Sequence, residues 1–297
     1  MPLASVIITV YRRTEFLKEC VDSVLNQSGM ERSDLEIIVV TNTDLSSIDL
    51  DSDKLIFSDQ RSIGQKLSIG VNASTSPLIF FLEDDDYFFP SKITTLLPLF
   101  QDEKVGYVHN LAADSTLGNE LQREPIVERI DSSWLDSQSF FSYSKKFWHY
   151  AGGMSCIGIR KNSINVEQIA NIQLLPDIQI LPMVLMHGMD CIQFNKSLTF
   201  YRRHSENTTS SLYDMNLARL AHDEGVSWLK YVAGKSINVE KQARALLLKR
   251  SLASHYYSSI VHRNDLIDLI QYELASGFFI NDLTFLFKNL IRDGVSR

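Results

Sequence analysis

Two short runs of β-branched and apolar residues enclose one amphipathic helix near the start of the chain. Residues 4–10 and 35–40 have the composition of central strands, apolar on both faces because helices cover both sides of their sheet. Between them, apolar residues recur at helical spacing from Phe16 to Leu25, with Thr14 as the expected N-cap. A parallel crossover of this kind is right-handed. The opening of the chain therefore predicts an α/β fold.

The same order of strand, helix and strand continues to residue 82. Residues 55–57 and 78–82 read as two further strands, and residues 63–73 as a helix, although Gly64 and Gly70 weaken that helix. From residue 212 onward the pattern is helical. We therefore expect a Rossmann-like, mostly parallel sheet flanked by helices over residues 1–210, followed by a helical C-terminal region over residues 211–297.

Composition excludes one class of function and indicates a compartment. A formal net charge of -7 argues against nucleic-acid binding through phosphate neutralisation. The three cysteines lie far apart, without a CxxC pattern, which favours a reducing setting. Neither a signal peptide nor a continuous apolar span of about 18 residues is apparent. The expected location is cytoplasmic, with the inner membrane face as an alternative.

Four consecutive acids, Glu83 to Asp86, follow the apolar strand 78–82. Like charges at this spacing repel, so a compensating divalent cation is expected, and carboxylate oxygens suit Mg²⁺ or Mn²⁺. Ligands of open α/β sheets bind at the carboxyl ends of the strands, where this turn lies. A solvated acidic turn is the alternative.

Taken together, these segments resemble the family 2 glycosyltransferases, which have the A-type glycosyltransferase fold, over about residues 1–210. The resemblance implies that the acidic turn is the Asp-x-Asp-type motif, which binds the metal and the donor's ribose and diphosphate. Glu83 and Asp84 are then expected at the donor, with Asp85 as the main metal ligand and Asp86 as a second. The segments that carry the resemblance are residues 6–12, 16–27, 36–40 and 81–86, with Pro90 and Lys92 beyond.

On the donor side, the resemblance places Tyr11 and Arg12 against the nucleotide base and its sugar, and Arg61 near the diphosphate. The Tyr11 ring can stack on the base. The alternative is that Tyr11 only caps the sheet. Thr41 and Asn42 stand where the family has an acidic pair that contacts the base. An Asn carbonyl accepts the same hydrogen bond, so a UDP-sugar is allowed and slightly favoured. Asp44 could substitute for the missing acid, and Lys66, also near the diphosphate, reads more readily as surface charge.

On the acceptor side, Gly152 and Gly153 resemble the family's glycine-containing segment, where backbone approaches a sugar closely. A simple turn explains the same residues. Asp177 resembles the family's carboxylate at a helix start and is the candidate base for an inverting transfer. A first-turn Asp also stabilises a helix, and both roles can hold.

Residues 200–205 resemble the Tyr-Arg-x-His segment of the family. His204 would complete the metal shell or contact phosphate, and Arg202 would stabilise the departing diphosphate. A surface basic cluster is the alternative.

The sequence thus predicts a metal-dependent inverting glycosyltransferase that uses a nucleotide diphosphate sugar and a carbohydrate or lipid-linked acceptor. Two alternatives stay open: a non-catalytic binding module on the same fold, suggested by Asn42 and Pro176, and a metal-dependent nucleotidyltransferase. The apolar end of the chain, residues 277–291, suggests docking on the catalytic domain, a homodimer contact, or peripheral membrane contact.

Overall fold

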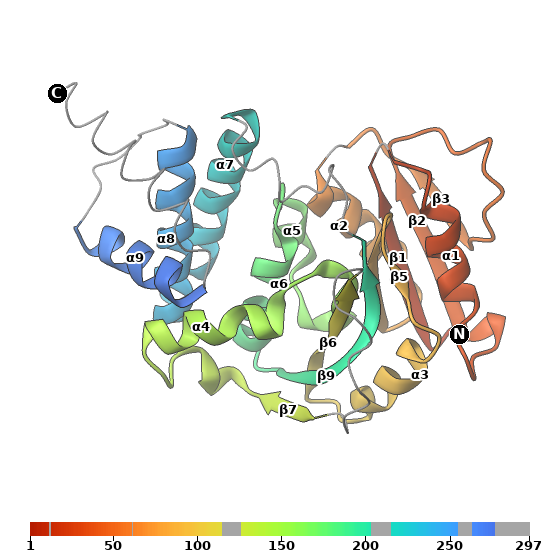
Figure 1. The fold of residues 1–297 in the computed structure, drawn as a ribbon, viewed down its shortest axis with the longest axis horizontal. Coiled ribbons are helices and arrows are strands. Elements are labelled where there is room, and N and C mark those ends of the chain that lie inside the picture. Colours follow the sequence, from red (N-terminus) through yellow and green to blue (C-terminus); the bar gives the residue numbers. More distant parts are fainter. Residues whose placement is uncertain (12, 61, 115–125, 203–214, 255–262, 277–297) are drawn as a thin grey trace. The chain divides into compact units, whose positions relative to one another are not determined.

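The computed structural model describes residues 1–297 except 12, 61, 115–125, 203–214, 255–262 and 277–297 (Figure 1). The chain divides into two compact units. Unit 1 comprises Met1–Ser132 and Ala151–His204, and unit 2 comprises Ser133–Tyr150 and Ser205–Arg297. The predicted boundary at residue 210 lies outside the described residues and stays a prediction.

The secondary structure confirms an α/β chain with a helical C-terminal part. The strands are β1 Ala4–Val10, β2 Leu35–Thr41, β3 Lys54–Phe57, β4 Leu78–Glu83, β5 Tyr87–Phe88, β6 Val105–Asp114, β7 Val127–Ile130, β8 Ile157–Arg160 and β9 Asp190–Tyr201. The helices are α1 Leu17–Leu25, α2 Ile63–Ala73, α3 Lys92–Leu96, α4 Phe140–Ala151, α5 Val166–Ala170, α6 Pro176–Met186, α7 Met215–Val232, α8 Ile237–Ser254 and α9 Arg263–Ser276.

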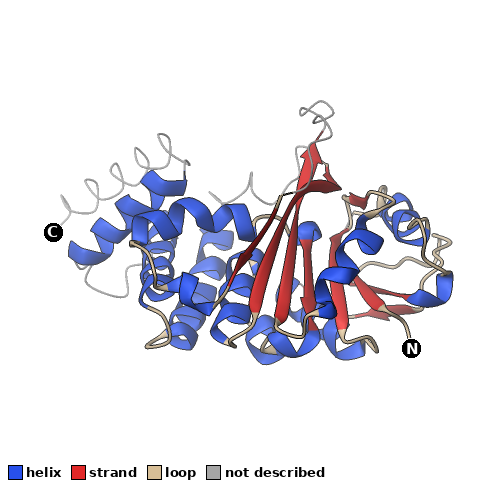
Figure 2. Ribbon diagram, turned by 90° about the horizontal axis from the view of Figure 1, so that it is seen from below, coloured by secondary structure: helices blue, strands red, loops and turns tan. Residues whose placement is uncertain are grey.

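All the strands belong to one sheet of unit 1 (Figure 2). Its order is β3-β2-β1-β4-β8-β6-β9-β5, with β7 paired to β9, and β3, β2, β1 and β4 are parallel to one another. The chain moves outward from β1 through β2 to β3 and then returns to the other side of β1 as β4. Such a reversal of strand order leaves a crevice at the carboxyl ends of β1 and β4, where ligands bind in this class of sheet.

Strand β1 is buried on both faces, as its apolar composition predicts. The side chains of Val6 and Ile8 pack in a core with Val21 of α1 and Ile93 of α3. On the opposite face Ile7 meets α2, where a Cβ on Gly70 would lie 2.5 Å from Ile7 Cγ2. Gly70 therefore weakens α2 intrinsically but allows it to pack closely on the sheet.

Unit 2 is helical, and it includes an aromatic segment that comes from the middle of the sequence. Within this unit α8 packs against α7 and α9. Tyr143 of α4 donates a hydrogen bond of 2.9 Å to Gln242 of α8, and Asp136 accepts one of 3.0 Å from the backbone N of Asn238. The serine-rich and aromatic stretch that precedes Gly152 thus folds with the helices.

Within the described ranges, no helix is long and apolar enough to cross a membrane. Residues 277–291, whose apolar character suggests docking, dimer or membrane contact, lie outside the described residues, so those contacts stay predictions. The cytoplasmic location stays a prediction as well.

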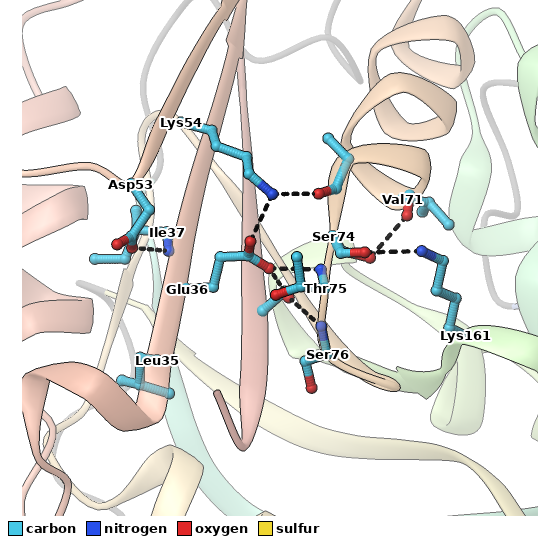
Figure 3. A network of polar contacts seen from close by, with 12 residues as sticks. Leu35, Glu36, Ile37, Asp53, Lys54, Val71, Ser74, Thr75, Ser76 and Lys161 are labelled. Carbon is cyan, nitrogen blue, oxygen red and sulfur yellow. Dashed lines mark hydrogen bonds and ion pairs between the residues drawn. The ribbon is translucent and has the colours of Figure 1, made fainter. Parts of the chain in front are cut away.

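A buried carboxylate joins three segments of unit 1 at the amino end of the sheet (Figure 3). Glu36, at 6% exposure, accepts hydrogen bonds from Lys54 Nζ at 2.7 Å, from Ser5 Oγ at 2.5 Å and from Thr75 N at 2.8 Å. Burial alone would raise the pKa of Glu36, but these three partners outweigh it and lower that pKa. The network links β1 and β2 to the turn that precedes β4.

Replacing Glu36 with Gln is expected to lower the free energy of unfolding by about 1–3 kcal/mol at pH 7, because one partner would then face an amide donor. The folded pKa of Glu36 lies below the unfolded one. The difference between the two proteins should therefore be complete above about pH 4.5 and shrink as the pH falls through the folded value. Denaturant unfolding at several pH values measures it. The exposed Glu103→Gln is the control, and an equal loss in both variants would contradict the role of Glu36.

Candidate active site at the carboxyl ends of β1 and β4

The four predicted acids follow β4 in a tight turn, in which Asp86 N donates to Glu83 O at 3.2 Å. Asp84, Asp85 and Asp86 are only 3%, 5% and 2% exposed. The alternative of a solvated acidic turn is therefore wrong. The turn lies beside the end of β1, at the crevice that the strand order creates.

Burial shifts the ionisation of the turn. It raises the pKa of Asp84 to about 6, that of Asp86 to about 7, and that of Glu83 well above its usual value. Hydrogen bonds and nearby cations act in the opposite direction at Asp84 and Asp86 without cancelling this effect. The turn therefore concentrates more carboxylate than its neighbours neutralise, and an additional cation would favour its charged form.

Among the described residues, two arginines contact the turn. Arg13 bridges two carboxylates, with Nη2 3.2 Å from Asp84 Oδ1 and Nη1 2.9 Å from Asp85 Oδ2. Arg202 donates from its backbone N to Asp86 Oδ1 at 3.0 Å and from Nε to the Asp85 carbonyl oxygen at 3.0 Å. Sequence analysis placed Arg202 and Arg12 at the donor. Arg12 lies outside the described residues, and Arg13 was not predicted.

The ends of β1 and β2 are joined by a buried lysine. Lys66, 1% exposed, donates to Val10 O at 2.6 Å and to Asn42 Oδ1 at 2.7 Å, and its Nζ lies 4.9 Å from the centroid of the Tyr11 ring. Burial lowers the pKa of Lys66 to about 8. The interpretation of Lys66 as surface charge is wrong. Tyr11 is 40% exposed, and its backbone N donates to Asp84 Oδ2 at 2.9 Å.

Not every predicted donor residue joins this group. Asp44 is exposed, and its carboxylate accepts a hydrogen bond of 2.9 Å from the backbone N of Ser46 in its own turn. That bond lowers the pKa of Asp44. Arg61 and His204 lie outside the described residues, so their roles stay predictions.

The predicted acceptor-side residues lie together. Gly153 adopts φ +85°, a left-handed conformation that glycine tolerates, and its N donates to Asp177 Oδ2 at 3.3 Å. The carbonyl of Gly152 contacts His109 Nε2 at 2.7 Å. Asp177 stands in the first turn of α6, and its charge helps to raise the pKa of Glu83. The candidate base therefore lies near enough to the acidic turn to influence it electrostatically.

A buried polar cluster, which the sequence did not reveal, connects these two sides. The Oγ of Ser155 accepts from Glu83 N at 3.0 Å, and the same side chain hydrogen-bonds to Asp86 and lowers its pKa. Lys92, fully buried on α3, donates to the Ser155 carbonyl oxygen and, at 2.7 Å, to Thr199 Oγ1. Burial lowers the pKa of Lys92 to about 7. Ser155 thus ties the acidic turn to the segment that carries Gly152 and Gly153.

Comparison with known proteins identifies the family of this chain. The model of the family "Glycosyl transferase family 2" matches residues 5–165, more than half of the chain. The chain belongs to glycosyl transferase family 2. The match includes β1, the acidic turn and the Gly152–Gly153 segment, which confirms the family predicted from the sequence.

Several proteins resemble this family 2 member. The uncharacterized glycosyltransferase alr2836 of Nostoc sp. is 31% identical over 118 residues, which span 36% of each protein. The chain spans less than half the length of the curated relatives that it matches. TarS of S. aureus, residues 1–349 in complex with UDP-GlcNAc, has a TM-score of 0.57 at 12% identity, covering 99% of this chain and 92% of that one.

A second solved structure is the mannosyltransferase PcManGT of Pyrobaculum calidifontis in complex with GDP-Man and Mn²⁺. Its TM-score is 0.54 at 13% identity, covering 98% of this chain and 86% of that one. At such identities these likenesses show the fold alone, and they confirm the predicted A-type glycosyltransferase fold.

The chemistry of the turn in this family 2 member suits a hard divalent cation, since its ligands would be carboxylate oxygens. Among the described residues, no three His, Cys, Asp or Glu side chains form a ready metal cluster. Mg²⁺ is commonly bound by one or two carboxylates together with substrate phosphates, so a preformed cage is not required. Asp85 and Asp86 are the residues that would bind the cation, and this assignment stays a prediction.

Replacing Ser155 with Ala is expected to weaken Mn²⁺ binding about tenfold, because residues that orient metal-binding carboxylates usually have effects of this size. Titration calorimetry measures the affinity. Ser163→Ala is the matched control: Ser163 is equally buried, and its Oγ donates to the carbonyls of Gly106 at 3.0 Å and Arg160 at 2.6 Å, away from the turn. Similar Mn²⁺ affinities in both variants would show that Ser155 serves stability alone.

Proposed function

We propose that this chain transfers a sugar from a nucleotide diphosphate donor to a hydroxyl group of a carbohydrate or lipid-linked acceptor, with inversion and with Mn²⁺ or Mg²⁺. The main support is the buried acidic turn at the crevice between β1 and β4, with Asp177 nearby. Family membership supports the transfer reaction. The UDP-GlcNAc and the GDP-Man with Mn²⁺ bound to the two similar structures support the class of donor and the cation.

On the donor side, the nucleotide lies across the carboxyl ends of β1 and β2, and its diphosphate lies at the acidic turn. Tyr11, with its exposed ring, stacks on the base or sugar, and Asn42 contacts the base edge. Asp85 and Asp86 would bind the divalent cation, which would supply positive charge against the departing diphosphate. Arg202 adds a guanidinium beside the same turn.

On the acceptor side, Asp177 removes the proton from the attacking hydroxyl group as the oxygen bonds to the anomeric carbon and the diphosphate leaves. The backbone N of Gly153, at 3.3 Å from Asp177 Oδ2, helps to orient that carboxylate. A glycine at this position also leaves room for a sugar to approach the backbone.

The test is incubation with UDP-, GDP- and TDP-sugars and a panel of sugar acceptors, with Mn²⁺ or with EDTA. We expect release of the nucleoside diphosphate with Mn²⁺ and its loss with EDTA. Binding of nucleotides without release in any mixture would favour the non-catalytic binding module. Release of inorganic diphosphate from nucleoside triphosphates would favour a nucleotidyltransferase.

A further inference from the structure

Arg13 bridges the two carboxylates at the centre of the acidic turn. Its Nη2 lies 3.2 Å from Asp84 Oδ1 and its Nη1 lies 2.9 Å from Asp85 Oδ2. The two aspartate side chains are 3% and 7% exposed, whereas that of Arg13 is 23% exposed. The guanidinium therefore covers buried carboxylates from the more exposed side, between the end of β1 and the start of α1.

Arg202 contacts other atoms of the turn. Its contacts with the turn run from its backbone N to Asp86 Oδ1 and from Nε to the carbonyl oxygen of Asp85, while its Nη2 donates to Glu19 Oε2 at 2.6 Å. Arg13 forms an ion pair with the Asp85 carboxylate, with Nη1 2.9 Å from Oδ2. A divalent cation bound to that carboxylate would lie a few ångströms from the Arg13 guanidinium, and the two positive charges would repel each other.

We propose that Arg13 binds the donor, and that in the free protein its side chain is paired with the acidic turn until the donor arrives. In the free protein its guanidinium pairs with the carboxylates of both Asp84 and Asp85 and offsets part of their charge. When a divalent cation arrives with the donor and takes the Asp85 carboxylate, the guanidinium moves to the oxygens of the donor diphosphate. The inference rests on the proposed function, because it requires a cation and a diphosphate at this turn.

The chemistry of the exchange is balanced in charge. A guanidinium donates two parallel hydrogen bonds to a carboxylate and equally well to a phosphate group. The same pair of N–H groups can therefore bind the turn in the free protein and the diphosphate in the donor complex. The turn exchanges one positive charge for a divalent cation, and the diphosphate supplies the negative charge that attracts the released arginine. The side chain of Arg13 is 23% exposed, so it is partly open to solvent.

The experiment compares wild type with Arg13→Met and with Arg13→Lys, which retains the charge without the fork. The control is Arg32→Met. Arg32 also bridges two aspartates, at 3.1 Å to Asp51 and 3.0 Å to Asp53, and these are exposed. Mn²⁺ affinity without nucleotide is measured by electron paramagnetic resonance, and the affinities of UDP and GDP with saturating Mn²⁺ by calorimetry. Thermal unfolding verifies that every variant is folded.

Removal of Arg13 should have opposite effects on the two ligands. We expect Arg13→Met to bind Mn²⁺ about tenfold more tightly and the nucleoside diphosphate about tenfold more weakly, with Arg13→Lys between it and wild type. Arg32→Met should match wild type in both measurements. Unchanged or weaker Mn²⁺ binding by Arg13→Met, or unchanged nucleotide binding, would overturn the role of Arg13 alone. Failure of wild type to bind any nucleotide diphosphate would overturn the donor site and this inference together.

Discussion

The variant Asp177→Asn is expected to reduce kcat by about 10²- to 10⁴-fold while nucleotide affinity stays unchanged, because the amide cannot accept the acceptor's proton. The side chain keeps its shape, so its contact with Gly153 N and the first turn of α6 should persist. Steady-state kinetics with donor and acceptor, together with calorimetry of the nucleotide, separates the chemical step from binding.

The matched control for this variant is Glu167→Gln. Glu167 is the acid in the first turn of α5, so its replacement removes the same kind of helix-dipole interaction without touching the site. We expect full activity from it. If Asp177→Asn retained wild-type kcat, the carboxylate would be a helix-stabilising group only, and the base would have to be sought elsewhere at the turn.

The variant Asp85→Asn is expected to abolish the Mn²⁺-dependent part of donor binding and to lower turnover by about 10²-fold or more. The physical reason is the loss of the charged ligand that would hold the cation against the departing diphosphate, an interaction worth several kcal/mol. Calorimetry of nucleotide binding with and without Mn²⁺ reads the first effect, and product release reads the second.

Asp51→Asn is the control for the Asp85 variant, since Asp51 is an exposed aspartate paired with Arg32 and lies away from the turn. It should bind Mn²⁺ and donor as wild type does. We expect Asp85→Asn to bind the donor equally well with Mn²⁺ and with EDTA, whereas donor binding by wild type should depend on the metal. A variant that still needs Mn²⁺ and turns over at the wild-type rate would move the metal site away from Asp85.

The strands and helices up to the end of β4 could be predicted, because the spacing of apolar residues along the chain is a local property. The continuous run of β-branched and apolar residues in β1 and the helical stripe of α1 are each visible in neighbouring residues of the sequence. The helix α2 was predicted with its bounds, although the reason for its Gly70 appears only in three dimensions, where it meets Ile7. The acidic turn was found because its strand and its acids are consecutive.

The groups that hold the turn in place could not be read from local patterns. Ser155 is 72 residues from Glu83, and Arg202 is 116 residues from Asp86. Only the family resemblance indicated Arg202. The sequence does not show that Lys66 is buried, because one of its partners, Asn42, lies at the end of another strand. The resemblance to the family does not indicate Arg13, because the matching segment ends at residue 12.

The acidic turn is expected to bind the donor diphosphate through a divalent cation. The most direct test of this binding is anomalous scattering from Mn²⁺ in crystals grown with a nucleoside diphosphate. We predict a single strong peak at the carboxylate of Asp85, bridged to the diphosphate, with Arg13 turned from that carboxylate toward the phosphate oxygens. A nucleotide bound in the crevice with no manganese at the turn, or manganese bound elsewhere, would contradict the account.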